Sequence, residues 1–363
     1  MATATKKRQQ LTRGDRAPNV FLPDQRDIII SLYDKARGGP IFVLLYPTQK
    51  DLGCAGELES LFALAPQMLA DGAHLFAIGG DPVALVQKLA AQHEPGFFLL
   101  ADAEHKAADA FGSRGKLVGF VLDPGQRIQK VITPGYTSIA ERAAAELLLL
   151  LPPEPFNPGF HPPLLVIPQA LPRDFCGYLI EEFEKRGSEA SGTLRMTEGK
   201  MVHADDATVK QRRDHHIVDQ DLIDPITDYM ERRVLPEIHR AFHCPIKFVE
   251  EFKIVRYDAD PGGYFRPHRD NTTPGTAHRR FAMTLNLNAE DYEGGELCFP
   301  EFDNATYKPA TGEAVIFSCN LLHEATDLID GQRYVLLSFM YDEPGRQVLE
   351  IYQRALAQQQ GGV

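Results

Sequence analysis

The residues of this chain whose types and spacing suggest chemistry lie between positions 255 and 341, around the segment YFRPHRDN. His268 and Asp270 are two positions apart, so an extended backbone would place both side chains on the same face. Further along, His323 ends an apolar run. Two imidazoles and one carboxylate on one face of a metal ion leave its other positions open, as in non-haem Fe(II) sites. The spacing therefore predicts a metal site formed by His268, Asp270 and His323.

A buried anion-binding group is expected next to this site. Arg333 follows His323 by ten residues and begins the segment RYVLLSF, in which every second residue shares its face. A guanidinium on such an apolar face requires an anion, and its planar donors suit a carboxylate held by two hydrogen bonds. The segment FAMTLNLN alternates polar and apolar residues, so one face of that strand could line a polar cavity. The polar residues of this segment are Thr284, Asn286 and Asn288.

Length, charge and cysteine content limit the classes of function. The 363 residues, 44% of them hydrophobic, can form a substantial core, and two domains are expected. A formal net charge of -12 argues against nucleic acid or an anionic membrane as the main partner, and a small or neutral substrate fits better. The expected partner is a small-molecule or peptide substrate. The apolar run at 143–153 is too short to span a bilayer. Five scattered cysteines without a CxxC pair suggest neither a disulfide framework nor a zinc site, and the expected location is a reducing cytoplasm.

The order of the expected elements divides the chain. Residues 1–11 are expected to be a disordered tail, and strands alternate with helices over 12–151, which predicts a sheet covered by helices. Asp81 is expected to cap a helix, and Ser138 and Glu141 have the spacing of a capping box. A proline-rich linker is placed at 152–164, followed by a helix that ends at Gly187. Short strands then predict a sandwich or barrel within a second domain at 165–352, with a flexible tail at 353–363.

The C-terminal half resembles the prolyl 4-hydroxylase-like branch of the Fe(II)/2-oxoglutarate dioxygenases. The similarity covers about residues 165–343 and includes RYDADPGGYFRPHRDN and HEATDLIDGQRYVLLSFMY. The resemblance implies a double-stranded β-helix, or jelly roll, with His268, Asp270 and His323 as iron ligands. It also implies that Arg333 holds the distal carboxylate of 2-oxoglutarate and that Tyr257 lines the cosubstrate pocket. By the same resemblance the cofactors would be Fe(II), 2-oxoglutarate and O2, with ascorbate as reductant, and the reaction would hydroxylate an aliphatic C–H of a prolyl-like or small-molecule substrate.

A second His-x-Asp pair occurs at His203 and Asp205, in a stretch without periodicity at 188–216. No histidine and arginine follow this pair at matching distances on strands, so both residues are interpreted as solvated. The stretch itself is interpreted as a long loop, either a lid that orders over the substrate or a surface insertion.

The N-terminal half, about residues 12–150, resembles the peroxiredoxins, a thioredoxin-like family. In YPTQKDLGCAGEL, Pro47, Cys54 and Glu57 stand where that family has its motif proline, peroxidatic cysteine and glutamate. A helix N-terminus favours a cysteine thiolate, but Asp51 replaces the family's Thr or Ser and its charge opposes one. Leu117 stands near the position of an expected arginine, and the domain has no second cysteine.

Three hypotheses follow from the sequence. The leading one is a soluble 2-oxoglutarate-dependent dioxygenase with a degenerate peroxiredoxin-like domain that serves stability, association into a homo-oligomer or substrate capture. The second is a single-cysteine thiol peroxidase that uses Cys54. The third is a non-enzymatic protein that binds or senses iron and 2-oxoglutarate.

Overall fold

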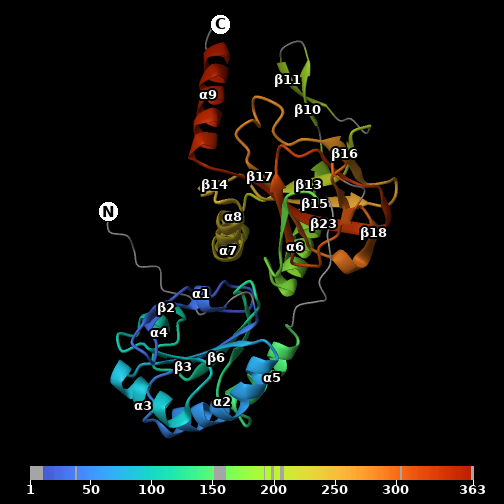
Figure 1. The fold of residues 1–363 in the computed structure, drawn as a ribbon. Helices are drawn as coiled ribbons and strands as arrows, with labels where there is room; N and C mark the ends of the chain where they lie inside the picture. Colours follow the sequence, from blue (N-terminus) through green and yellow to red (C-terminus); the bar gives the residue numbers. More distant parts are fainter. Residues whose placement is uncertain are drawn as a thin grey trace. The chain divides into compact units, whose positions relative to one another are not determined.

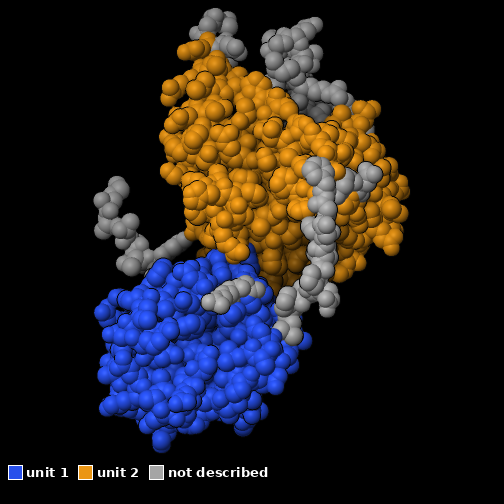
Figure 2. Space-filling model, in the orientation of Figure 1, with its two compact units in different colours: residues 1–156 blue, residues 157–363 orange. Residues whose placement is uncertain are grey.

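The computed structural model describes residues 11–36, 39–150, 161–191, 193–197, 200–204, 208–302 and 305–360. The chain divides into two compact units, residues 1–156 and 157–363, which Figure 2 colours separately. Within the described residues, no helix is both long enough and apolar enough to cross a membrane.

Unit 1 is built on a mixed sheet with the strand order β5-β4-β3-β6-β7. β3 runs parallel to β4, and β4 runs parallel to β5, whereas β6 is antiparallel to β3 and pairs with β7 as the expected hairpin. This is the thioredoxin-like arrangement that the sequence suggested. The strands span β3 Ile41–Tyr46, β4 His74–Gly79, β5 Phe98–Ala101, β6 Val118–Leu122 and β7 Ile128–Ile132.

Helices and a hairpin cover the two faces of this sheet, as Figure 1 shows. One face packs against α2 (Leu52–Ala70), α3 (Val83–His93) and α5 (Ile139–Leu148). The other face is covered by the hairpin of β1 (Phe21–Pro23) and β2 (Ile29–Ser31), with α1 (Leu32–Ala36) and α4 (Lys106–Ala110). The central strands are buried on both faces, which explains why IFVLLY reads as a continuous apolar run.

The helix termini of unit 1 confirm one expected cap and correct another. Ser138 and Glu141 form the predicted capping box at α5. Asp81, however, does not cap α3, which begins at Val83 after Pro82. The carboxylate of Asp81 instead accepts hydrogen bonds from Thr48 Oγ1 at 2.6 Å and from the Gln49 N–H at 2.8 Å. Partners that are 33 and 32 residues away in sequence thus outcompete the local helix terminus.

Unit 2 contains a large antiparallel sheet in the order β8-β21-β17-β23-β15-β13-β9. Its strands are β8 Leu164–Ile167, β9 Glu189–Ala190, β13 Arg213–His216, β15 Lys253–Asp258, β17 Phe281–Asn286, β21 Ala314–Ser318 and β23 Leu328–Tyr341. β14 (Phe248–Val249) and β18 (Tyr292–Gly294) add short pairings to β23. One face of this sheet packs against α6 (Arg173–Arg186), α7 (Gln220–Tyr229), a π-helical turn (Met230–Val234) and α8 (Leu235–Phe242).

A second sheet of unit 2 has the order β12-β16-β22-β19-β20. It comprises β12 Lys210–Gln211, β16 Tyr264–His268, β19 Leu297–Cys298, β20 Thr306–Tyr307 and β22 His323–Ala325, with a 3-10 turn at Ala289–Asp291 before β18. Apolar residues of this sheet share buried clusters with residues of the large sheet; Ala325 and Val335 belong to one such cluster, and Leu297 and Val315 to another. Two antiparallel sheets packed face to face form the expected jelly roll.

Two expectations about unit 2 were wrong. The stretch 188–216 is not an irregular loop, because it contains β9, β12 and β13 together with the hairpin of β10 (Thr193–Thr197) and β11 (Lys200–Ala204). β12 and β13 are strands because they pair with the distant strands β16 and β15. Their residues are mostly polar, so the sequence shows no alternation of polar and apolar residues there. The expected tail from 353 is helical as far as Gln360, because α9 (Glu343–Gln360) is rich in helix-forming Ala, Leu and Gln. The helix end expected at Gly187 is confirmed, with φ 81° at that residue.

Candidate functional site

The two predicted histidine ligands face each other across a strand pair of unit 2. His268 ends β16 and His323 begins β22, and these residues are direct partners in the antiparallel register. Their ring centroids are 4.3 Å apart. Asp270 lies just after β16, where its N–H donates to the Cys319 carbonyl at 3.0 Å. One nitrogen of each ring and a carboxylate oxygen of Asp270 all lie within 4.8 Å of one another, so one ion could contact all three.

Backbone carbonyls hold both imidazoles in the orientation that a metal site requires. Nδ1 of His268 lies 2.8 Å from the Arg266 carbonyl, and Nδ1 of His323 lies 3.0 Å from the Leu321 carbonyl. A carbonyl only accepts, so each Nδ1 donates its hydrogen and each Nε2 keeps a free lone pair. Each Nε2 is 3.4 Å from an oxygen of Asp270. Such bonds to the second nitrogen are typical of histidines that bind metals.

Burial and charge adjust the protonation of these groups toward metal binding. Burial lowers the pKa of His323, which favours the neutral imidazole that can donate a lone pair. Burial alone would raise the pKa of Asp270, but His323 and His268 hold it below its usual value, so the carboxylate is ionised. A neutral His323 and an ionised Asp270 are the forms that bind a metal ion.

Arg333 lies in the same pocket as the three candidate ligands, on β23 directly opposite Tyr257 of β15. It is 4% exposed, and its guanidinium carbon is 5.1 Å from the centre of the Tyr257 ring. Burial raises the pKa of the neighbouring Tyr292 hydroxyl, and a hydrogen bond with Arg333 opposes this rise. Among the described residues no carboxylate pairs with Arg333, whose contacts include the ring of Tyr257 and the hydroxyl of Tyr292.

Two unsatisfied polar atoms in this pocket test whether the site fits a carboxylate cosubstrate. Arg333 Nε and Thr284 Oγ1 are both buried, and neither has a hydrogen-bond partner within the described part of the chain. An unpaired buried donor is costly, and ligand oxygens that accept from these two groups would remove that cost. The three candidate metal ligands and this pair line one cavity, so the residues present fit both Fe(II) and the distal carboxylate of 2-oxoglutarate. Val335, Leu337 and Phe339 line the same cavity, as the alternation after Arg333 predicted.

Of the three alternating polar residues Thr284, Asn286 and Asn288, only Thr284 lines this cavity. Asn286 donates to the Tyr292 hydroxyl at 2.9 Å and to the Pro309 carbonyl at 2.6 Å. Asn288 donates to the Gln332 carbonyl and accepts from the Tyr334 N–H. These two amides therefore join strands and turns, and the polar cavity expected from their alternation is limited to Thr284.

The predicted redox cysteine lies in unit 1 at the start of α2. Asp51 is the N-cap of this helix, and its Oδ1 accepts hydrogen bonds from Gly53 N–H at 2.9 Å and Cys54 N–H at 3.2 Å. Cys54 is 2% exposed. Glu57, one turn further on, accepts a hydrogen bond from Ile139 N–H at 2.7 Å and so helps to cap α5. Two positions of the peroxiredoxin-like motif thus contribute to helix termini.

These surroundings disfavour a thiolate at Cys54. Burial is the largest cause of the raised pKa of this thiol, and the charge and hydrogen bond of Asp51 raise the pKa further, as does the charge of Asp81. A backbone hydrogen bond from Thr48 acts in the opposite direction. Leu117, at the position where an arginine was expected, packs against the apolar cluster that contains Cys54. The residues that shift the pKa of Cys54, namely Thr48, Asp51 and Asp81, include no cation.

Two parts of the chain, one in each unit, match known protein families. Residues 252–341 match the 2OG-Fe(II) oxygenase superfamily, and residues 13–134 match the AhpC/TSA family. The chain joins an AhpC/TSA-like region to a 2OG-Fe(II) oxygenase-like region. A PKHD-type hydroxylase of Prochlorococcus marinus is 35% identical to the oxygenase-like region over 81 residues, which are 22% of this chain and 37% of that protein.

Each region also resembles further proteins. Peroxiredoxin Bcp of Escherichia coli is 26% identical to the AhpC/TSA-like region over 140 residues, which are 35% of this chain and 89% of that protein. The crystal structure of a prolyl-4-hydroxylase of Pseudomonas putida aligns with 50% of this chain and 92% of its own, with 18% identity and a TM-score of 0.39. The chain spans little more than a third of the length of the PKHD-type hydroxylase that it matches.

The oxygenase-like region contains pocket residues that the sequence did not single out. Arg212, Lys253 and Phe265 line the cavity together with the candidate ligands. Lys253 could have been found from β15, because it shares a strand face with Tyr257. Arg212 carries no comparable signal, since it lies between the short strands β12 and β13. The second His-x-Asp pair is not tested, because Asp205 and the side chain of His203 lie outside the described residues.

Proposed function

We propose that the oxygenase-like region is an Fe(II)- and 2-oxoglutarate-dependent hydroxylase. The observation that carries this proposal is the convergence, in one cavity, of a two-histidine, one-carboxylate ligand set and a buried arginine without a carboxylate partner in the described chain. In this proposal His268, Asp270 and His323 hold the iron. Arg333 holds the distal carboxylate of 2-oxoglutarate, and Tyr257 packs beside that carboxylate.

In this proposal different groups of unit 2 orient the metal ligands, bind the cosubstrate and exclude water. The backbone carbonyls of Arg266 and Leu321 keep Nε2 of the two imidazoles directed toward the metal. Arg333 and Thr284 supply donors that orient the cosubstrate, and the apolar residues of β23 exclude water around it. Bound in this way, Fe(II), 2-oxoglutarate and O2 would supply the oxidising chemistry that converts a substrate C–H to C–OH and gives succinate and CO2.

The match to a PKHD-type hydroxylase supports hydroxylation as the reaction. We propose an aliphatic C–H in a peptidyl prolyl-like side chain or a small molecule as the group hydroxylated. Ascorbate is proposed as the reductant that keeps the iron in the ferrous state. Both statements are part of the proposal.

The test is O2-dependent succinate formation by the full-length chain reconstituted with Fe(II) under anaerobic conditions. We expect succinate after O2 is added to the wild type with 2-oxoglutarate, a higher yield with ascorbate, and none with Asp270→Ala. Asp327→Ala is a matched control, because it removes a carboxylate of the same unit that is 63% exposed and pairs with Arg266. If the wild type binds iron and 2-oxoglutarate but forms no succinate, the non-enzymatic binding or sensing hypothesis replaces this one.

For the AhpC/TSA-like region we propose a structural or associative role in place of a fast peroxidase. The raised pKa of Cys54 and the position of Asp51 support this role, because little thiolate would form near neutral pH. Rapid peroxide consumption by the wild type that is lost in Cys54→Ser would contradict it and support the thiol peroxidase hypothesis.

A further inference from the structure

The pocket of the oxygenase-like region contains two cationic side chains that the proposed iron and cosubstrate sites do not use. Arg212 and Lys253 both line the cavity that holds His268 and Arg333. Tyr257 contacts both arginines of the pocket, because its hydroxyl accepts a hydrogen bond from Arg212 at 3.2 Å and the guanidinium carbon of Arg333 is 5.1 Å from the centre of its ring. Arg212 and Lys253 are therefore cations of the pocket in addition to Arg333.

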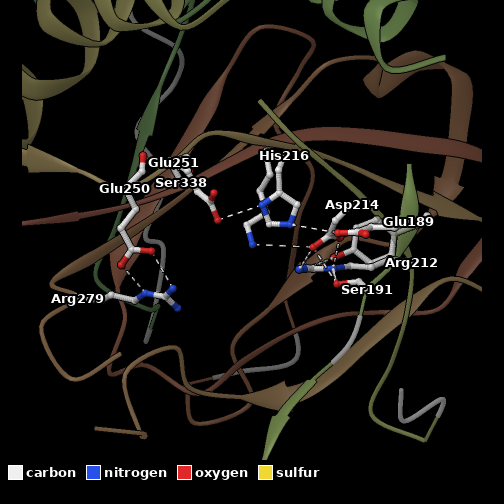
Figure 3. Close-up of polar contacts among 11 residues, drawn as sticks. Glu189, Ser191, Arg212, Asp214, His216, Glu250, Glu251, Arg279 and Ser338 are labelled. Carbon is white, nitrogen blue, oxygen red and sulfur yellow. Dashed lines mark hydrogen bonds and ion pairs between the residues drawn. The ribbon is translucent and has the colours of Figure 1, made fainter. Parts of the chain in front are cut away.

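Arg212 is fixed in place by its own contacts. Its Nε is 3.0 Å from Oδ1 of Asp214, and its side chain is 8% exposed. Its guanidinium also lies 5.1 Å from the centre of the Phe265 ring, which in turn stacks on His268 with centroids 3.4 Å apart. This stack places Arg212 one aromatic ring away from a proposed iron ligand. Figure 3 shows the contacts that join Asp214, Arg212 and Ser191.

The ammonium group of Lys253, in contrast, has N–H donors without an acceptor among the described residues. Its Nζ is 3.9 Å from Oδ2 of Asp214, which is an ion pair without a hydrogen bond, and no other acceptor among the described residues bonds to it. Oδ2 of Asp214 already accepts from Ser191 at 2.8 Å and from Arg212 at 3.2 Å. The Lys253 side chain is 18% exposed, so few water molecules can replace the missing partners.

The charges around Lys253 leave an excess of positive charge inside the pocket. Asp214 is the carboxylate that faces both Arg212 and Lys253, so two cations share one anion there. Glu251 also influences Lys253, but its side chain is 54% exposed and hydrogen-bonded to His216, so water screens its charge (Figure 3). Arg279 adds a further positive charge, which a hydrogen-bonded pairing with Glu250 neutralises. Because two cations share this one carboxylate, an anion that enters the cavity beside Lys253 would gain a favourable charge interaction.

We propose that Lys253 binds a carboxylate of the molecule that is hydroxylated, beside the ion pair of Arg212 and Asp214. The inference rests on the proposed function and adds a substrate class, an acid whose carboxylate binds at Lys253 while 2-oxoglutarate binds at Arg333. This carboxylate could belong to the end of an amino acid or peptide, or to an acidic side chain. An ammonium with free donors suits either source, because it binds an anion as a point charge without a fixed fork.

The experiment measures binding to the full-length chain loaded with Mn(II) and saturated with N-oxalylglycine, so that no turnover occurs. Calorimetry compares two acids with their amides. N-acetylglycine and its amide represent a terminal carboxylate, whereas N-acetylaspartate N-methylamide and its asparagine counterpart represent an acidic side chain. We expect at least one acid to bind about ten- to hundredfold more tightly than its amide, the range of one charge-assisted hydrogen bond. The pair that shows this preference identifies the source of the carboxylate.

Three variants assign the preference to Lys253. Lys253→Met should abolish it and leave the affinities for Mn(II) and N-oxalylglycine unchanged, whereas Lys253→Arg should retain it. Lys247→Met is the matched control, since Lys247 is also 3.9 Å from a carboxylate but is 58% exposed and outside the pocket. We expect the preference to persist in this control.

Several outcomes would overturn the proposal. They are equal affinity for acid and amide in both pairs, a preference that survives Lys253→Met, and competition of the acid with N-oxalylglycine, which would place the acid at Arg333. In each case Mn(II) and N-oxalylglycine still bind, so the proposed function stands. Failure of the wild type to bind Mn(II) and N-oxalylglycine would instead refute the proposed function, and the substrate inference with it.

Discussion

Replacing Arg333 should have opposite effects on the ligand-free and the ligand-bound protein. In the ligand-free protein Arg333 is a buried cation without a carboxylate partner in the described chain, held by Tyr292 and by the ring of Tyr257. Replacing buried ionic groups by apolar ones of similar size stabilises proteins by about 1–4 kcal/mol in favourable cases. The lost aromatic contact costs about 0.5–2 kcal/mol. We therefore expect Arg333→Met to unfold with a free energy within about 1 kcal/mol of the wild type, or above it.

The ligand-bound protein should respond in the other direction. At a 2-oxoglutarate concentration of about 100 times the dissociation constant, binding stabilises the wild type by about 2.7 kcal/mol. Arg333→Lys keeps the charge but loses the planar fork, at a cost of about 1.5–3 kcal/mol or roughly ten- to hundredfold in affinity. At the same concentration the stabilisation should fall to about 1.4 or 0.4 kcal/mol. Arg333→Met should show almost none.

The assay is chemical unfolding of the full-length chain with Mn(II), with and without 2-oxoglutarate, following the transition of unit 2. Arg233→Met is a matched control, because Arg233 is 3% exposed in the same unit but donates to the Gln169 carbonyl. This control should lose about 1–3 kcal/mol in the ligand-free state and keep its response to 2-oxoglutarate. An unchanged dissociation constant for 2-oxoglutarate in Arg333→Lys would refute the reasoning, as would a ligand-free Arg333→Met variant destabilised as much as the control.

Three further perturbations test other parts of the structure. His268→Ala and His323→Ala should each leave a folded protein that loses tight Mn(II) binding, and full metal occupancy in both, measured by elemental analysis, would refute the ligand set. Asp51→Thr should lower the pKa of Cys54, because it removes a charge that opposes the thiolate while threonine still caps α2. The pH dependence of Cys54 alkylation by iodoacetamide should therefore shift to lower pH, and an unchanged pH profile would contradict this. Trypsin should not cleave within residues 212–216 of the native ligand-free protein, because β13 is hydrogen-bonded on both sides, and early cleavage there, found by mass spectrometry, would contradict the sheet pairing.

Patterns in the sequence predict the structure best where all the interacting residues lie within one helix or strand. The capping box of Ser138 and Glu141 forms as its spacing predicts, since all its atoms lie within one helical turn. The cap expected at Asp81 fails, because its carboxylate finds partners at Thr48 and Gln49 that local spacing does not reveal. The strands within 188–216 were missed for the same reason, since β13 is defined by its pairing with β15.

For the candidate site, the sequence by itself determined which residue types are available and that His268 and Asp270 share a face, because the period of a strand is a local property. Only the tertiary structure decided that His323 stands opposite His268, since the register of β16 and β22 is fixed by sheet pairing across 55 residues of chain. It also decided the arrangement of Arg212, Lys253 and Asp214. A free lysine donor beside a shared carboxylate is a property of three-dimensional charge balance, which depends on burial and on distances between strands.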